Sequence, residues 1–333
     1  MPFIRMQVTV MLKKKVLYIL EQEKGSVVSG GRLATTLGVS RNGVLNAIRR
    51  LRNDGNEIVS VPNTGYRLLE TNDTLFEQII RDGLTTTFTG QKMALLPTVH
   101  STNQYLKEME TDNVDNGFVV IADEQTNGRG RRSRTFISQK REGAYFSILL
   151  KLDSAKQDIR LLTICAAVAV SKAIEKTCDI RADIKWVNDI FYSGKKICGI
   201  LTEAMLSGEL QELGSVIVGI GINTGNLPSE LADIATSVQE ATGVRGIRNQ
   251  LIAEVLNQFE SIYLDYTECN KKQDIIEYYK SRLFITGKQV LVTDTTNDYI
   301  ATVLGIDDTG ALLVRDDSGD VQHISTGEIK LKW

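Results

Sequence analysis

The sequence predicts a multidomain protein of mixed structure (α/β, or α+β), because three stretches of its 333 residues carry different patterns. Residues 1–70 show short helical stretches followed by a hairpin pattern. Over residues 71–285 apolar strands alternate with helical stretches, whereas residues 286–333 hold short strands separated by turns. We therefore expect an N-terminal winged helix-turn-helix domain, a central domain with a mixed sheet and a small C-terminal β-barrel.

The N-terminal stretch contains three short helices. Residues 1–10 lack helical periodicity and are expected to form a tail, with Met6 or Met11 as an alternative translation start. The helices are then expected at about residues 13–21, after the N-cap Ser29 up to Gly38, and after the N-cap Ser40. Two helices joined by a short turn that contains glycine are typical of a helix-turn-helix, and a hairpin over residues 58–69 completes the winged-helix pattern.

The later elements follow from apolar runs and turn residues. Central strands are expected at residues 118–122, 145–150, 197–202 and 216–222. Central helices are expected at residues 103–109, 160–176 and 248–266. Strands of the C-terminal β-barrel are expected at residues 289–293, 300–304, 311–314 and 321–324.

Charge is distributed unevenly along the chain. Residues 1–70 hold eleven Lys and Arg against five Asp and Glu, although the whole chain has a net charge of −2. This asymmetry indicates a basic module on a more acidic body. On the third expected helix, the polar side chains that would meet bases and phosphates of DNA are Arg41, Asn42, Asn46, Arg49 and Arg50. A merely solvated basic helix is the alternative.

Composition excludes other classes. The four cysteines form no C-x-x-C pair and the chain has only two histidines, so we expect reduced, buried thiols rather than a zinc site. There is no secretory signal pattern, and the most apolar stretch, residues 161–170, is about half the ~20 residues that span a bilayer. We expect a cytoplasmic protein without a membrane partner.

The most informative segment is the arginine loop, residues 125–134, which reads Gln-Thr-Asn-Gly-Arg-Gly-Arg-Arg-Ser-Arg. Its glycines permit close backbone approach, and guanidinium groups bind anions in fork geometry. A solvated loop or a nucleic-acid patch is the alternative interpretation. The strand expected at 118–122 leads into the loop and places it at a strand end, where α/β proteins build sites. We therefore favour an anion-binding loop.

Three other motifs are weak individually. Residues 100–103 (His-Ser-Thr-Asn) also suit a helix cap, and residues 185–189 (Lys-Trp-Val-Asn-Asp) suit a strand that ends in a turn. Residues 219–223 (Gly-Ile-Gly-Ile-Asn) are not a dinucleotide fingerprint, because the third glycine and the following helix are missing. Their glycine pair suits packing as well as ligand contact.

In this order, however, the motifs resemble the bifunctional biotin–protein ligases that are also biotin operon repressors (the BirA family). The resemblance covers residues 13–333 and includes Gly-Ile-Asp-x-x-Gly-Ala-Leu-Leu at 305–313 and Gly-Glu-Ile at 327–329. It implies a winged-helix domain at 1–70, a biotin/lipoate ligase domain similar to class II synthetases at 71–285, and an SH3-like barrel at 286–333.

The resemblance also implies the activity of a biotin–[acetyl-CoA-carboxylase] ligase. Biotin, ATP and Mg²⁺ would give biotinyl-5′-AMP, whose biotinyl group passes to a lysine of a biotin carboxyl carrier protein of acetyl-CoA carboxylase or pyruvate carboxylase. The adenylate-bound protein would be a homodimer that binds operator DNA and represses biotin genes.

Site residues are carried over from the family position by position. The catalytic residues would be Arg129, Arg131 and Lys185. Biotin would be bound by Ser101, Thr102, Asn103, Gln125, Gly128, Arg129, Gly130, Arg131 and Lys185. The nucleotide would contact Arg131, Arg134, Phe136, Asn188, Asp189 and Asn223. The resemblance does not identify the metal ligands.

The chemistry agrees with these roles. Joining a carboxylate to the α-phosphate of ATP brings two anions together, so positive side chains must stand where negative charge accumulates. Phosphoryl transfer depends on positioning and electrostatics, and no Ser-His or Cys-His nucleophile is needed.

Three residues depart from the family pattern. Ser133 stands where a glycine is common, which would stiffen the loop, and Phe136 stands for tryptophan, which would weaken stacking on adenine. Val187 replaces a proline and changes the backbone restraint beside Lys185. None of the three removes a charged group.

Two other functions are alternatives. A repressor whose ligase-like domain only senses a ligand would have less need of Arg129, Arg131 and Lys185 together. A lipoate or octanoate ligase shares the catalytic fold, but the winged helix and the C-terminal barrel together favour biotin.

Overall fold

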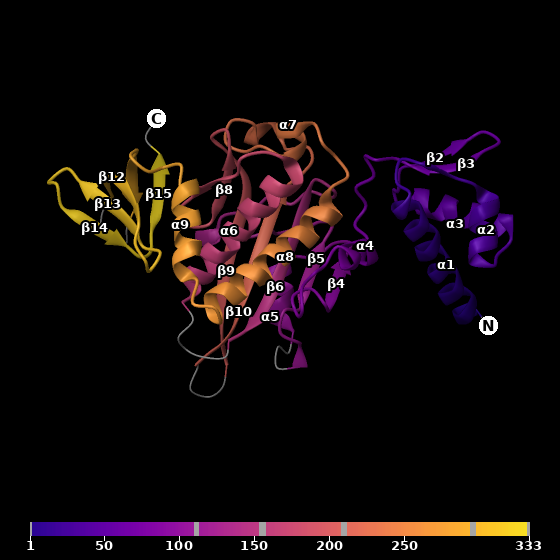
Figure 1. Ribbon diagram of the computed structural model, residues 1–333, viewed down its shortest axis with the longest axis horizontal. Helices are drawn as coiled ribbons and strands as arrows, with labels where there is room; N and C mark the ends of the chain where they lie inside the picture. Colours follow the sequence, from indigo (N-terminus) through magenta and orange to yellow (C-terminus); the bar gives the residue numbers. More distant parts are fainter. Residues whose placement is uncertain (1, 110–112, 153–157, 208–211, 294–297, 332–333) are drawn as a thin grey trace. The chain divides into compact units, whose positions relative to one another are not determined.

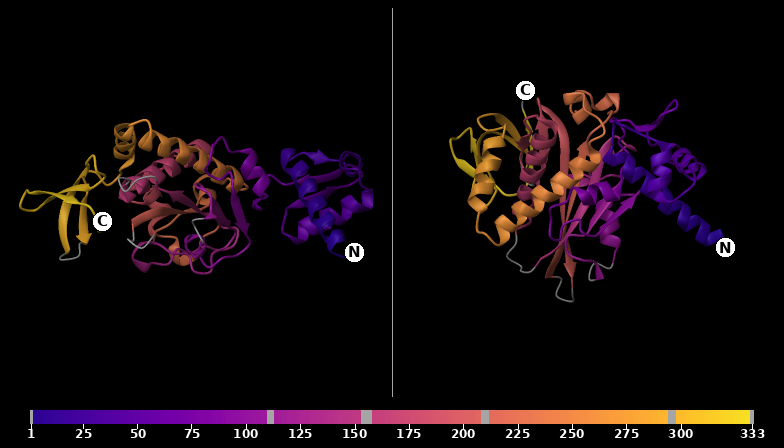
Figure 2. Two further views of the ribbon diagram at one scale, coloured as in Figure 1. Left: turned by 90° about the horizontal axis from the view of Figure 1, so that it is seen from below. Right: turned by 45° about the vertical axis from the view of Figure 1, so that its right-hand side comes forward.

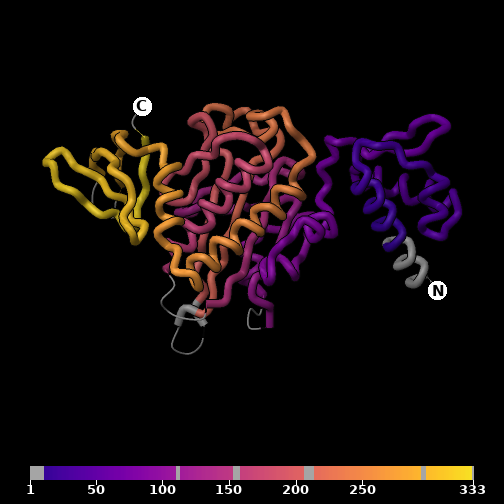
Figure 3. The backbone as a smooth tube through the Cα atoms, in the orientation of Figure 1, coloured from indigo at the N-terminus to yellow at the C-terminus, as the bar shows by residue number. Residues whose placement is uncertain are grey.

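The computed structural model describes residues 2–109, 113–152, 158–207, 212–293 and 298–331. The chain divides into two compact units, Met1–Gly83 with Val244–Gln250 and Leu84–Gly243 with Leu251–Trp333. Figures 1 and 3 follow the elements and the backbone along the sequence. Among the described residues, no helix has both the length and the apolar character needed to cross a membrane. The domain boundaries expected after residues 70 and 285 stay predictions.

The first unit holds a helix-turn-helix with a small sheet. Its elements are α1 (Pro2–Gln22), β1 (Val27–Val28), α2 (Gly30–Leu37), α3 (Arg41–Asn53), β2 (Ile58–Val61), β3 (Gly65–Leu68) and α4 (Glu77–Asp82). The antiparallel strands have the order β1-β3-β2. The expected caps are present, since the hydroxyls of Ser29 and Ser40 accept hydrogen bonds from the N–H groups of Arg32 and Gly43 at 3.0 and 3.1 Å. Gly38 ends α2 with φ 65°, in the left-handed region that favours glycine.

The expected N-terminal tail is wrong, because α1 begins at Pro2. Proline suits the first position of a helix, where its missing N–H needs no partner, and no glycine or further proline interrupts the following twenty residues. Further along α1, Val16 and Leu20 are fully buried in the same core as Leu33 of α2 and Ile48 of α3.

The second unit is built on a seven-stranded sheet of order β4-β5-β6-β10-β9-β8-β7. Its strands are β4 (Met93–Leu96), β5 (Val119–Ala122), β6 (Gly143–Lys151), β7 (Asp183–Lys185), β8 (Asp189–Tyr192), β9 (Lys195–Ser207) and β10 (Glu212–Asn223). Among the described strands of this sheet, only the β4–β5 pairing is parallel, so the sheet is mixed, as expected. β4, β7 and β8 were not assigned from the sequence.

Helices α6 and α8 lie across one face of this sheet (Figures 1 and 2). The helices are α5 (Thr102–Glu108), α6 (Ile159–Cys178), α7 (Val238–Thr242), α8 (Arg248–Thr267) and α9 (Lys272–Arg282), with short 3-10 turns η2 (Arg131–Ser133) and η3 (Ser229–Leu231). The apolar stretch of α6 contacts β8, β9 and β10 and is buried, which confirms the buried helix expected there.

The C-terminal residues form a five-stranded antiparallel sheet of order β14-β13-β12-β11-β15. Its strands are β11 (Gln289–Thr293), β12 (Asp298–Ile306), β13 (Leu312–Asp316), β14 (Val321–Ile324) and β15 (Glu328–Leu331). Four strands were expected, and β15 is an addition that pairs with β11. Closure of this sheet into an SH3-like barrel stays a prediction.

Candidate functional site

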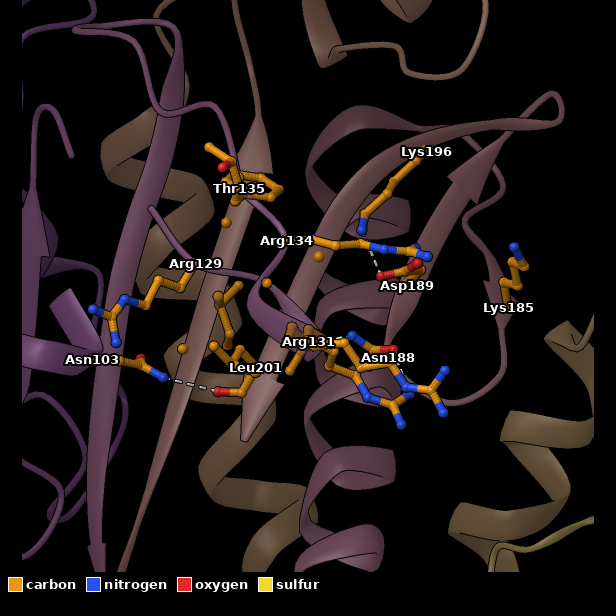
Figure 4. A pocket seen from close by; sticks show the side chains of 18 of the residues that line it. Asn103, Arg129, Arg131, Arg134, Thr135, Lys185, Asn188, Asp189, Lys196 and Leu201 are labelled. Carbon is orange, nitrogen blue, oxygen red and sulfur yellow. Dashed lines mark hydrogen bonds and ion pairs between the residues drawn. The ribbon is translucent and has the colours of Figure 1, made fainter. Parts of the chain in front are cut away.

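A pocket in the second unit gathers most of the residues singled out from the sequence (Figure 4). Its lining comes from the start of α5, the arginine loop, the β7–β8 turn, strands β9 and β10, and the start of β15. The predicted residues that line it are Ser101, Thr102, Asn103, Gln125, Arg129, Gly130, Arg131, Arg134, Phe136, Lys185, Asn188 and Asp189.

The start of α5 both caps a helix and lines the pocket. Ser101 is the N-cap, and its hydroxyl accepts from the N–H of Gln104 at 3.5 Å. The side chains of Thr102 and Asn103 are buried and face a polar group beneath them. There the hydroxyl of Ser147, on β6, lies 2.6 Å from both Thr102 Oγ1 and Asn103 Oδ1. No sequence pattern pointed to Ser147, since it is a single polar residue in an apolar strand.

The Asn103 amide is held on its other side as well. Its Nδ2 donates to Glu203 Oε2 at 2.8 Å and to the Leu201 carbonyl at 3.2 Å. Gly219 makes room for it, because a Cβ on this glycine would stand 2.2 Å from Asn103 Oδ1. The glycine of β10 is therefore needed for packing and lines the pocket at the same time.

Gln125 connects α5 to the arginine loop. Its Oε1 accepts from the Thr102 N–H at 2.8 Å and its Nε2 donates to Ser138 Oγ at 2.9 Å. Gly128 does not line the pocket, but a Cβ there would stand 2.3 Å from the Phe136 carbonyl. Gly128 thus allows the two arms of the loop to approach closely.

The arginines of the loop point in different directions. Figure 4 shows Arg129 and Lys185 at opposite sides of the pocket, with Arg131 between them beside Asn188. Arg131 donates to Asn188 Oδ1 at 3.4 Å and to the Gly327 carbonyl at 3.2 Å. Burial lowers the pKa of Arg131, because it disfavours the charged guanidinium. An anion bound beside the Arg131 guanidinium would offset the cost of burying its charge.

The tip of the loop has an unusual backbone. Arg132 and Ser133 have φ of 53° and 59°, in the left-handed region that favours glycine. A glycine at position 133 would fit this conformation. Serine adopts it with some strain.

Lys185 ends β7 and is half-buried. Burial lowers the pKa of its ammonium, which lies 5.6 Å from the centre of the Phe191 ring. The next side chain, Trp186, is buried and donates to the Gly310 carbonyl at 3.0 Å. The peptide bond between Trp186 and Val187 is cis.

The β7–β8 turn adds two polar groups. Asn188 Nδ2 donates to the Ile200 carbonyl at 2.6 Å, and Asp189 pairs with Lys196 at 2.7 Å. Lys196 also lines the pocket and was missed in the sequence, where it is one of two adjacent lysines after a turn. Asn223 does not line the pocket, because its buried amide donates to the Thr236 carbonyl at 3.1 Å.

Phe136 lies over the glycines of the central strands. Its ring packs edge-on against Tyr145, with centroids 6.4 Å apart. A Cβ on Gly221 would stand 2.5 Å from this ring, and one on Gly199 would stand 3.3 Å from it. Phe136 therefore forms an apolar wall of the pocket.

The pocket lining combines cationic side chains with uncharged polar ones. Six cationic side chains line it, namely Arg129, Arg131, Arg132, Arg134, Lys185 and Lys196, against the carboxylates Asp189 and Glu328. Thr102, Asn103 and Gln125 add uncharged polar groups to the lining, and Figure 4 shows Arg129 on the same side of the pocket as Asn103. Such a site can hold a ligand that has an uncharged polar head together with a carboxylate and phosphates.

In the first unit, α3 presents the residues expected to meet DNA. Its apolar side, including Val44, Ile48 and Leu51, is buried. Its predicted DNA-binding residues are all exposed, namely Arg41, Asn42, Asn46, Arg49 and Arg50. A recognition helix needs this division between a packed and a polar face.

Comparisons with known families match all three parts of the chain. Residues 95–223 match the biotin/lipoate A/B protein ligase family. Residues 13–67 match an HTH domain, and residues 285–332 match the biotin protein ligase C terminal domain.

Individual relatives match over nearly the whole length. The chain is 37% identical over 324 residues to the bifunctional ligase/repressor BirA of Bacillus subtilis (strain 168), which covers 96% of this chain and 98% of that protein. It is 29% identical over 311 residues to BirA of Escherichia coli (strain K12), with 92% and 94% covered. The biotin protein ligase of Aquifex aeolicus in complex with biotin and ATP has a similar structure, with TM-score 0.64, 30% identity, and 73% of this chain and 99% of that chain covered.

Proposed function

Because the chain belongs to the family of bifunctional ligase/repressors typified by BirA, we propose that it ligates biotin to a carrier protein with ATP and represses biotin genes. One observation carries the ligase function: a single pocket combines uncharged polar side chains with six cationic ones. The exposed polar face of α3 supports the second function, binding of operator DNA.

In the first half-reaction, a biotin carboxylate oxygen attacks the α-phosphorus of ATP, and pyrophosphate leaves. The ureido head of biotin lies against Ser101, Thr102, Asn103 and Gln125, which places its carboxylate toward the arginine loop. Arg129 and Arg131 bind the carboxylate and the α-phosphate, and Lys185 bridges the two. These cations lower the cost of bringing two anions together. Arg134, Phe136 and Asn188 lie beside the nucleotide.

In the second half-reaction, a lysine amine of the acceptor attacks the acyl carbon of biotinyl-5′-AMP. An amide forms and AMP leaves. The acceptor is a biotin carboxyl carrier protein of acetyl-CoA carboxylase or pyruvate carboxylase. Arg131 retains the adenylate until the acceptor arrives. Both ATP and such an acceptor are found in the cytoplasm, where we place the protein.

A magnesium ion fits the site only with ATP. No three His, Cys, Asp or Glu side chains gather into a metal site among the described residues. Mg²⁺ usually takes one or two carboxylates and otherwise phosphate and water, so Asp189 would hold it beside the phosphates. When bound, it supplies positive charge to the departing pyrophosphate.

The adenylate also favours a homodimer in this proposal. One winged helix offers a single recognition helix, whereas a two-fold dimer reads two half-sites. An adenylate bound to Arg129 and Arg131 orders the arginine loop and so lowers the entropy cost of an interface that the loop helps to form.

The ligase proposal is tested with purified full-length protein, ATP and either biotin or lipoate, followed by mass measurement of the acyl-adenylate. Biotinyl-adenylate is the expected product. Lipoyl-adenylate alone would make the protein a lipoate ligase. Biotin binding without any adenylate would leave a repressor that only senses its ligand.

A further inference from the structure

The β7–β8 turn, residues 186–188, is held from behind the pocket by helix α9. Tyr279 of α9 is fully buried, and its hydroxyl donates to the Val187 carbonyl at 3.2 Å. Burial and the nearby Asp189 raise the pKa of this hydroxyl, so it keeps its proton and stays a donor. Tyr279 does not line the pocket, so its hydroxyl acts on the turn and not on a ligand bound there.

The carbonyl that Tyr279 holds belongs to the peptide that leads into Asn188. Asn188 itself is fixed to β9 twice, since its carbonyl accepts from the Ile200 N–H at 2.9 Å and its Nδ2 donates to the Ile200 carbonyl at 2.6 Å. A carbonyl only accepts hydrogen bonds, so Nδ2 faces Ile200 and Oδ1 faces away from it. These contacts direct Asn188 Oδ1 toward Arg131, which lies beside it in Figure 4.

The guanidinium of Arg131 is oriented by this oxygen and by one other. It donates to Asn188 Oδ1 at 3.4 Å and to the Gly327 carbonyl at 3.2 Å. Both acceptors are uncharged, so they orient the guanidinium without neutralising the charge that an anion would meet. At 3.4 Å the contact with Asn188 is near the limit of a hydrogen bond, so a shift of the turn by about a few tenths of an ångström would break it. The orientation of Arg131 therefore depends on what holds the turn.

We propose that Tyr279 is a positioning residue for retention of the adenylate. By holding the Val187 carbonyl it fixes the peptide that leads into Asn188, and Asn188 in turn orients Arg131 toward the bound phosphate. That the bound anion is biotinyl-5′-AMP rests on the proposed function. A guanidinium that is oriented before the anion arrives loses less conformational entropy on binding, so the anion is held longer.

The test removes the hydroxyl alone, with Tyr279→Phe in the full-length protein. Biotinyl-5′-AMP is formed on the protein from labelled biotin and ATP, and its release is followed after an excess of unlabelled biotin is added. Loss of one neutral hydrogen bond should make release about two- to tenfold faster. Release is measured below the melting temperature of every variant, so that unfolding does not contribute.

The neighbouring tyrosine of the same helix provides the matched control. Tyr278 is half-buried, and its hydroxyl donates to Glu175 Oε2 at 3.0 Å outside the pocket. Tyr278→Phe makes the same chemical change one residue away and should leave the release rate unchanged.

Double variants show whether Tyr279 acts through the proposed route. An Arg131→Gly background lacks the guanidinium, and an Asn188→Ala background lacks the oxygen that orients it. Adding Tyr279→Phe to either background should not accelerate release further, because the group through which the hydroxyl acts is already missing. Incorporation of 4-aminophenylalanine at position 279 keeps an N–H donor there and should restore part of the retention.

Release from Tyr279→Phe at the parental rate would overturn the proposal. Faster release on adding Tyr279→Phe to Arg131→Gly would overturn it too, because the hydroxyl would then act by a general loosening of the site. Equal acceleration by Tyr278→Phe would have the same meaning. In each of these cases the parent protein still forms biotinyl-5′-AMP, and the proposed function stands without this role. If the parent protein forms no adenylate, both fall.

Discussion

Arg134 of the arginine loop and Glu328 of β15 form an ion pair, which joins two segments that lie far apart in the sequence of the second unit. Arg132 lies 3.7 Å from the same carboxylate, and Arg131 donates to the neighbouring Gly327 carbonyl. The start of β15 therefore holds the loop from one side. Glu328 had no sequence signal as a site residue, although Gly-Glu-Ile at 327–329 was part of the family pattern.

Replacing Glu328 with Gln should loosen the loop without unfolding the protein. Because the Arg134 side chain is 62% exposed, we expect the free energy of unfolding to fall by less than ~1 kcal/mol. Amide hydrogen exchange over residues 129–134 should become faster, while exchange in β6 stays unchanged. Unchanged exchange in the loop would show that the pair does not restrain it.

Replacing Arg131 with Gly should release the adenylate. The substitution removes charged hydrogen bonds worth ~1.5–3 kcal/mol if the bound adenylate makes them, roughly a ten- to hundredfold loss of retention. Free biotinyl-adenylate then acylates nearby lysines without selectivity. Biotin incorporation into a bystander protein without a carrier domain measures this. The control is Arg181→Gly, an exposed arginine outside the pocket, and equal bystander labelling by both variants would contradict the assignment.

Lys185 should give adenylate formation a distinctive pH dependence. Burial lowers the pKa of its ammonium from 10.5, so the free protein loses this charge at a lower pH than an exposed lysine does. We expect kcat/KM for adenylate formation to fall on the alkaline side below pH 10.5. Lys185→Arg, which stays charged, should move that fall to higher pH, and Lys185→Ala should be slow at every pH. Adenylate formation by Lys185→Ala at the parental rate would refute its role.

The lowered pKa of Lys185 also makes the free energy of unfolding depend on pH. The unfolded ammonium has the higher pKa, so burying it charged costs stability below the folded pKa. The cost falls as pH rises above the folded pKa and is gone only above the unfolded value of 10.5. Lys185→Met should therefore stabilise the protein more at neutral pH than near pH 10.

A chain that begins at Asn72 should keep biotin ligation and lose operator binding, because it keeps the pocket and lacks α3. For the full-length protein, log affinity for DNA should fall with log salt, with a slope of about −0.9 per phosphate neutralised. Arg49→Ala, at an exposed position, should make that slope shallower by roughly one such step. Affinity that does not change with salt would contradict the assigned surface.

Biotin and ATP together should shift the protein toward a dimer and strengthen operator binding. Sedimentation with and without both substrates measures the first effect. Coupling is reciprocal, so the dimer should release adenylate more slowly than the monomer. Adding unmodified acceptor should consume the adenylate and reverse both effects. If neither the monomer–dimer equilibrium nor the DNA affinity changes, the protein is a ligase without this regulation.

The sequence by itself determined the features that depend on neighbours along the chain. Ser29, Gly38 and Ser40 cap helices through contacts within a few residues, so their positions could be predicted. The order of the motifs determined the family, and with it most of the pocket lining. The tail expected at residues 1–10 was wrong because a helix can form without an amphipathic period, as α1 does from Pro2 onward.

Only the tertiary structure decided what residues distant in sequence do together. From the sequence, Gly219 suits packing and ligand contact equally. The structure shows that the Asn103 side chain packs against it. Lys196 and Glu328 line the pocket, and Ser147 contacts Thr102 beside it, because the fold brings together strands of two different sheets, which no single segment encodes. Asn223 lies outside the pocket, where its buried amide donates to the Thr236 carbonyl. The fold, and not the local sequence, places these two groups within hydrogen-bond distance.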